Sequence, residues 1–223
     1  RDSLVTGVQT CALPICQRIR PLLAALSYLA YSNSENDEFL QPLTLIIECF
    51  HKASLIHDDI EDNANERYNT LTAHAKHGVP QAINAGDFLI GKGYELLSEL
   101  DTSTETIKNC LRFIARSHLQ LTRGQGVDIL FNDGKIQLLP DEMIGVFKNK
   151  TGEAIKVALL VGAIVGKATN QEQKILEQFA DYMGIAYQIR DDLNEFEEQH
   201  PLEKTADYPF LLALLNKHFA DQE

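Results

Sequence analysis

The sequence predicts an all-α fold: a single-domain bundle of long helices around a central cavity, with a functional site among facing side chains. Apolar residues recur at helical spacing almost throughout the chain from Gln17, and strand signals are few. No linker, repeat or low-complexity run divides the chain. Hydrophobic residues make up 44% of the 223 positions, which is enough apolar side chain for a sizeable core.

The first half of the chain contains three expected helices. Pro21 suits a first helical turn, and four leucines follow at helical spacing: Leu22, Leu23, Leu26 and Leu29. A second stripe runs from Leu43 to Ile56. The polar, asparagine-rich segment 62–71 predicts a loop, and a third helix is expected over about 81–100.

The second half continues the pattern. Residues 101–103 carry a helix start signal for a helix that runs toward Ile129, and residues 132–134 form a turn signal. His118 on that helix is interpreted as a core histidine rather than a ligand. Pro140 opens a helix through about 165, a capping box at Asn170 and Gln173 starts the next, and a last helix covers about 209–219.

Residues 1–15 are expected to be foreign to the domain. The stretch 5–15 looks like a translated sequencing adaptor, and the alternative is a natural N-terminal tail. We therefore expect a domain over 16–223 that lacks part of its native N-terminus.

Charge and cysteine usage exclude several classes of protein. The formal net charge of -12 argues against a nucleic-acid partner, which would need basic surface to neutralise phosphates. The charge could also serve only to keep the protein soluble. No apolar run reaches the length of a membrane span. The four cysteines form no CxxC pair, which fits a reducing compartment, and we expect a cytoplasmic protein.

The first motif that suggests chemistry is an aspartate cluster at the end of an apolar helical stripe. Asp58 and Asp62 are one turn apart on one face, with Asp59 about 100° round the helix from Asp58. Clustered carboxylates repel one another, and divalent cations reverse that interaction. Oxygen ligands of this kind suit Mg²⁺. A solvated acidic helix end is the alternative interpretation.

A second cluster repeats the pattern downstream. Asp191, Asp192 and Glu195 follow an apolar helical stripe. Two such helices in a bundle are expected to bring their carboxylates together as a cation clamp for a polyanion.

The two motifs carry a resemblance to a known family. Leu55-Ile56-His57-Asp58-Asp59-Ile60-Glu61-Asp62 and the run from Gly184 to Asp192 resemble the two aspartate-rich motifs of trans-prenyl diphosphate synthases. The resemblance covers residues 17 to about 215. It implies an isoprenoid synthase-like fold, Mg²⁺ at Asp58, Asp59, Asp62, Asp191, Asp192 and Glu195, a homodimer, and isopentenyl and allylic diphosphates as substrates.

The resemblance also assigns residues around the motifs. It implies that Arg20 and His51 bind isopentenyl diphosphate, and that the allylic diphosphate is bound by Arg67, Lys150, Thr151, Gln188 and Lys204. Lys150, Thr151 and Arg67 would be the catalytic residues. As alternatives, the arginines could be ordinary surface residues, Lys150 a snorkelling side chain and His51 a core histidine.

The implied reaction is ionisation of the allylic diphosphate, attack by the isopentenyl double bond and proton loss to the released diphosphate. In the family, a bulky aromatic residue just before the first motif limits the length of the product. Ala53 and Ser54 occupy the nearest positions here, so Phe50, about one turn earlier, is the residue expected to limit chain growth. The expected product is geranylgeranyl diphosphate.

Three departures from the family pattern bear on this assignment. Gln17 and Tyr68 replace basic residues, Glu195 replaces an Asp, and the segment 196–210 is short. Two rival functions therefore stay open: a terpene cyclase-like enzyme and a non-catalytic subunit of a hetero-oligomeric synthase.

Overall fold

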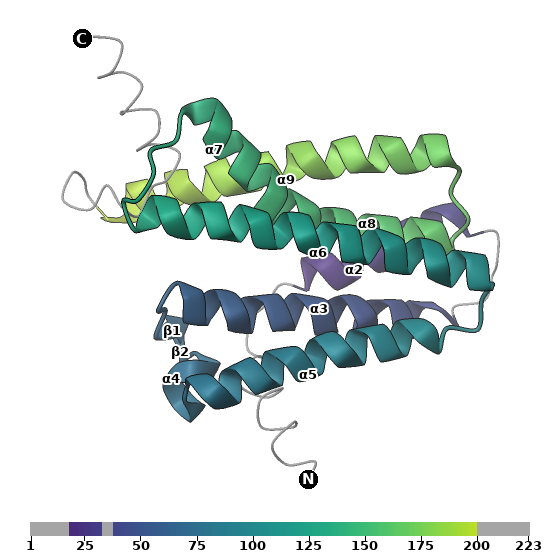
Figure 1. The fold of residues 1–223 in the computed structure, drawn as a ribbon. Coiled ribbons are helices and arrows are strands. Elements are labelled where there is room, and N and C mark those ends of the chain that lie inside the picture. The colour runs from purple at the N-terminus through teal and green to yellow at the C-terminus, as the bar shows by residue number, and fades with distance from the viewer. Residues whose placement is uncertain (1–17, 33–37, 200–223) are drawn as a thin grey trace. The chain divides into compact units, whose positions relative to one another are not determined.

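The computed structural model describes residues 18–32 and 38–199, with side chains through residue 194 (Figure 1). The described elements are α2 (Ile19–Tyr31), α3 (Leu40–Glu61), β1 (Glu66–Arg67), β2 (Thr70–Leu71), α4 (Ala73–His77), α5 (Val79–Ser98), α6 (Thr104–Asn132), α7 (Pro140–Phe147), the π-helical turn η1 (Lys148–Gly152), α8 (Glu153–Val165) and α9 (Asn170–Gln199). The expected all-α class is confirmed. The expectations for residues 1–15 and for a helix over 209–219 lie outside the described residues.

The chain folds as two compact units. The first comprises residues 1–112 and 158–168, and the second comprises residues 113–157 and 169–223. Helices α6 and α8 each pass from one unit into the other, so that neither unit is a single continuous stretch of sequence.

The first unit is centred on α3 and α5, which run side by side (Figure 1). Ala53 and Ile56 of α3 pack with Ala82 and Leu89 of α5 in a buried apolar cluster. This packing holds α3 in place along its length, including the C-terminal end that carries the first aspartate cluster.

Helix α2 buries a different face from its leucine stripe. Leu22, Leu26 and Leu29 are exposed, whereas the buried residues of α2 are Pro21, Ala24, Ser27 and Tyr28. The reason is close packing against the end of α8: a Cβ at Gly162 would lie 2.2 Å from the Ala24 carbonyl oxygen, and Ser27 Oγ donates to the Leu159 carbonyl at 2.7 Å. The missing Cβ of Gly162 on α8 permits this approach to the backbone of α2.

The expected loop over 62–71 contains a small antiparallel hairpin of β1 and β2. Its two turn residues, Tyr68 and Asn69, have φ of 53° and 59°. Positive φ at both central positions is the backbone of a tight two-residue hairpin. The hairpin directs the chain back so that Arg67 lies next to the end of α3.

The second unit contains most of α6, together with α7, η1 and α9. Phe131, Met143 and Phe147 belong to its buried apolar cluster, against which Ile185 and Ile189 of α9 pack. The sequence predicted one regular helix from Pro140 to about 165. The structure instead interrupts that helix with the wider turn η1, which carries Lys150 and Thr151.

The start of α9 differs by one residue from the expected capping box. Thr169 rather than Asn170 precedes the helix: Thr169 N donates to Glu172 Oε2 at 2.7 Å, and Glu172 N donates to Thr169 Oγ1 at 3.3 Å. The Thr-x-x-Glu pattern therefore forms in preference to the overlapping Asn-x-x-Gln pattern. At α6 the expected start signal is confirmed, since Ser103 Oγ accepts from Thr106 N at 3.1 Å.

Loss of the Thr169 cap is expected to destabilise the protein measurably. Thr169→Ala removes the two hydrogen bonds of the hydroxyl, one donated to Glu172 Oε2 at 2.7 Å and one accepted from Glu172 N at 3.3 Å. It should lower the free energy of unfolding by about 1 kcal/mol, while Thr169→Ser should retain most of the stability. Chemical denaturation checks this. A larger loss from Asn170→Ala than from Thr169→Ala would contradict the observed cap.

Within residues 18–32 and 38–199, no helix has the combination of length and apolar character needed to cross a membrane.

Candidate functional site

The first aspartate cluster ends α3. The Asp62 N–H donates to the Asp58 carbonyl oxygen at 2.8 Å, which places these two residues one turn apart as expected. Asp58 is partly buried and Asp62 is exposed. Their carboxylates therefore lie on the accessible side of the helix end.

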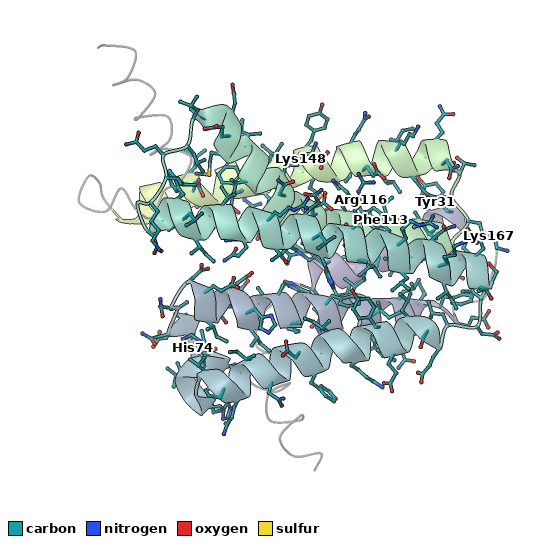
Figure 2. All side chains as sticks on the ribbon, viewed as in Figure 1. Tyr31, His74, Phe113, Arg116, Lys148 and Lys167 are labelled. Carbon is teal, nitrogen blue, oxygen red and sulfur yellow. The ribbon has the colours of Figure 1, made fainter. Side chains whose placement is uncertain are left out.

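Asp59 has different surroundings. It is only 5% exposed, and both Arg67 Nε and Arg67 Nη2 lie 2.7 Å from its Oδ1. Burial raises the pKa of Asp59, although the Arg67 charge and hydrogen bond oppose that shift. His74, labelled beside the hairpin in Figure 2, contributes further positive character. The structure thus brings two predicted site residues together as an ion pair.

Arg20 and His51 also meet in this unit. Arg20 Nη1 lies 3.0 Å from His51 Nδ1 and 2.9 Å from His51 Nε2, across 31 residues of sequence. Burial, followed by the charges of Arg20, Lys52 and Arg67, lowers the pKa of His51 to about 2. His51 is therefore a neutral ring that accepts a hydrogen bond from Arg20, and the structure brings these two predicted residues into contact.

The neutral state of His51 predicts a pH dependence of stability. The unfolded histidine binds a proton below pH 6.5, and the folded one does so only near pH 2. Stability therefore falls as pH is lowered through that window, by at most about 1.4 kcal/mol per pH unit from this residue. Denaturant unfolding at several pH values should show a shallower dependence for His51→Gln than for the original chain. Equal slopes below pH 6 would contradict the neutral assignment.

In the second unit, η1 and α9 present a chain of hydrogen bonds. Thr151 Oγ1 donates to Gln188 Oε1 at 3.1 Å, and Gln188 Nε2 donates to Asp192 Oδ1 at 3.2 Å. Asp192 is buried, whereas the neighbouring Asp191 is partly exposed and pairs with Arg190 at 3.3 Å. Three predicted residues, one from η1 and two from α9, are thus joined, and Asp191 remains on the accessible side of α9.

Lys150 has a partner that the sequence reasoning missed. Its Nζ lies 2.6 Å from Asp128 Oδ2 on α6. Asp128 follows the stretch Arg123-Gly124-Gln125-Gly126, to which no chemistry was assigned from sequence. The one signal in the sequence that could have indicated Asp128 is its position four residues after Gly124, which places the two residues on the same face of a helix. The contact orients Lys150, whose ammonium carries three N–H donors.

The two motifs share one arrangement. In each, the second aspartate is buried and hydrogen-bonded to a neighbouring side chain, and the first is more accessible. Across the described part of the chain, no group of three or more His, Cys, Asp or Glu side chains forms a metal cage. Carboxylates offered singly or in pairs fit Mg²⁺, which keeps several waters and shares phosphate oxygens of a substrate.

Some predicted residues cannot be placed. Gln17 and Lys204 lie outside the described residues, and the Glu195 side chain also lies outside them, although its main chain belongs to α9.

Comparisons with known proteins give one consistent answer. The family model described as polyprenyl synthetase matches residues 5–207. A geranylgeranyl diphosphate synthase from Sulfolobus acidocaldarius is 31% identical over 179 residues, covering 79% of this chain and 53% of the relative. A farnesyl diphosphate synthase from Geobacillus stearothermophilus is 32% identical over 188 residues, covering 81% and 62%. The chain thus spans little more than half the length of such relatives.

Solved structures agree. A geranylgeranyl pyrophosphate synthetase from Geoglobus acetivorans has a TM-score of 0.84 at 26% identity, covering 99% of this chain and 73% of that one. A geranyltransferase from Helicobacter pylori, solved with magnesium and isoprenyl diphosphate, has a TM-score of 0.81 at 26% identity, covering 100% and 77%. The match over most of the chain, together with both aspartate motifs in their expected order, shows that this chain belongs to the polyprenyl synthetase family.

Proposed function

We propose that the chain is a trans-prenyltransferase that condenses isopentenyl diphosphate with an allylic diphosphate, giving an all-trans product of geranylgeranyl length. The observation that carries the proposal is the arrangement shared by the two aspartate motifs. Asp59 is buried and contacts Arg67, and Asp192 is buried and contacts Gln188. The preceding aspartate of each motif, Asp58 or Asp191, lies on the accessible side. Membership of the polyprenyl synthetase family supports the same reaction.

Asp58, Asp62 and Asp191 are the proposed ligands of Mg²⁺, and bound Mg²⁺ would neutralise charge on the departing diphosphate. The sequence also nominates Asp59 and Asp192 as ligands. Each would support the preceding aspartate of its own motif, Asp59 through its contact with Arg67 and Asp192 through its contact with Gln188. Glu195 stays a predicted ligand from the resemblance alone.

The basic residues divide into two groups by proposed role. Lys150, oriented by Asp128, and Arg67, oriented by Asp59, would donate to the allylic diphosphate as negative charge develops on it. The Thr151 hydroxyl and the Gln188 amide would bind the same diphosphate. Lys204 remains a predicted diphosphate ligand from the resemblance.

The pair of Arg20 and His51 would hold isopentenyl diphosphate. Its charge comes from Arg20 alone, because His51 is neutral. In the proposed reaction the allylic C–O bond breaks, and the isopentenyl double bond forms the new C–C bond. The released diphosphate then takes the proton that restores a double bond, so the chain supplies no side-chain base.

The decisive test supplies labelled isopentenyl diphosphate and an allylic diphosphate together with Mg²⁺. A synthase incorporates label into a longer prenyl diphosphate. A terpene cyclase-like enzyme releases diphosphate without incorporating label, and a non-catalytic subunit does neither by itself. Each outcome therefore selects one of the three functions.

Phe50 is the proposed limit to chain growth. Its buried ring stacks edge-on against Tyr94 of α5, with ring centroids 5.1 Å apart. Phe50→Ala should shift products beyond geranylgeranyl length, as measured by chromatography of the dephosphorylated alcohols. Because removing a core Phe costs about 3–5 kcal/mol, Phe50→Leu provides a milder variant. An unchanged product from both folded variants would disprove this role.

The homodimer and the cytoplasmic location that the sequence suggests stay predictions.

A further inference from the structure

Four charged side chains meet where η1 contacts α8 and α9, and none of them was predicted as a site residue. Lys148 Nζ lies 2.8 Å from Asp181 Oδ2, and Lys156 Nζ lies 2.8 Å from Asp181 Oδ1. Lys156 also contacts Glu153 Oε1 at 2.6 Å. Figure 2 labels Lys148, where the helix that begins at Pro140 passes α9. We name these four residues the Asp181 cluster.

Lys148 is exposed, whereas the other three residues of the cluster are largely removed from solvent. Lys156 and Glu153 are each 8% exposed, and the Asp181 side chain is 17% exposed. Burial alone lowers the pKa of Lys156, but the hydrogen bonds and charges of Asp181 and Glu153 outweigh it and raise that pKa. Lys156 is thus a buried ammonium that depends on its carboxylates, and losing one of them carries a substantial cost.

The π-helical turn brings the two lysines to one carboxylate. A turn with i→i+5 hydrogen bonds holds one residue more than an α-helical turn. Lys148 and Lys156 are eight positions apart. Because the wide turn takes up one extra residue, their directions around the helix axis are those of residues seven apart in a regular α-helix, which share a face. Asp181 therefore bridges one lysine inside the wide turn and one lysine beyond it.

The contact face of α9 connects this cluster to the candidate site. Asp181, Gly184 and Gln188 follow one another at spacings of three and four, so they share a face. Gly184 allows the backbone of Gly152 to approach, since a Cβ there would lie 2.5 Å from Gly152 N. Along α9, Asp181 therefore fixes η1 on one side of the glycine contact, and Gln188 fixes Thr151 on the other.

We propose that Asp181 is a positioning residue that, through Lys148 and Lys156, holds η1 in the conformation in which Lys150 and Thr151 bind a diphosphate. The proposal rests on the proposed function for its substrate. Asp181 itself contacts no reacting atom in this account.

The test compares Asp181→Asn with Glu177→Gln, which removes a carboxylate one turn earlier on the same helix. Asp181→Asn should raise the KM for the allylic diphosphate and lower kcat by on the order of 10- to 100-fold, because a small displacement of positioned groups has effects of that size. The KM for isopentenyl diphosphate should not change. Asp181→Glu should restore part of the activity, and Glu177→Gln should behave like the original chain.

Two further measurements separate positioning from a general loss of stability and from failure of the proposed function. Amide hydrogen exchange at residues 148–152 should accelerate in Asp181→Asn at a temperature where the variant is folded. Binding of inorganic diphosphate in Mg²⁺ buffer should weaken in that variant alone. If the original chain catalyses no condensation, the proposed function fails, and diphosphate binding still decides the role of Asp181. The proposal would be overturned if folded Asp181→Asn showed the same amide exchange at residues 148–152 and the same diphosphate binding as the original chain.

Discussion

Asp58→Asn should abolish most of the condensation activity while leaving the fold intact. The carboxylate lies on the accessible side of the end of α3, one turn from Asp62, and the substitution removes its charge while keeping the shape of the side chain. Losing several kcal/mol of charge stabilisation in the transition state corresponds to a fall in kcat/KM of about 10²- to 10⁴-fold. Steady-state kinetics at several Mg²⁺ concentrations would measure the loss, which excess Mg²⁺ should partly offset.

Glu61→Gln is the matched control for this prediction, since Glu61 is an exposed carboxylate on the same turn of α3. It should retain activity near that of the original chain. If Asp58→Asn is as active as Glu61→Gln, the first motif is only a solvated helix end, and the proposed metal site is wrong.

Gly184→Ala should cause the largest structural defect in the second unit. The added methyl group would lie 2.5 Å from both N and Cα of Gly152, and two backbones cannot move apart by a change of rotamer. Overpacking of this kind costs about 1–3 kcal/mol, occasionally more. The displaced turn should also lose the hydrogen bond from Thr151 to Gln188, so activity should fall with stability. Thermal unfolding and kinetics on one preparation would measure both effects.

A glycine in the same unit provides the comparison. A Cβ at Gly145, in α7, would have no other atom within 4 Å. Gly145→Ala should therefore stabilise the protein by up to about 1 kcal/mol through helix propensity. Equal effects of the two substitutions would contradict the close approach of η1 and α9.

The helices were predictable because their signals are local. Apolar spacing marked α3 and α6, Ser103 marked the start of α6, and residues 132–134 marked its end, where Gly134 has a φ of 68°. Features set by tertiary packing were not predictable. In the π-helical turn Gly152 meets Gly184 of α9, and on the buried face of α2 Ala24 meets Gly162, and both contacts join residues far apart in the sequence.

The candidate site shows the same division. The aspartate motifs are short patterns and could be found by spacing. The sequence also nominated Thr151 and Gln188, but their hydrogen bond joins residues 37 positions apart. Asp128 and Asp181 were missed, because an acidic residue whose lysine partner lies on another helix has no local signature. Their identification required the packing of α6 and α9 around η1.

The most direct test of the central claim is the stoichiometry of the reaction. Released diphosphate and incorporated isopentenyl label would be counted in the same Mg²⁺-containing mixture with an allylic diphosphate primer. Prenyl transfer predicts one diphosphate released for each isopentenyl unit incorporated, with both reduced together in Asp58→Asn. Release of diphosphate without incorporation of label would contradict the proposed function.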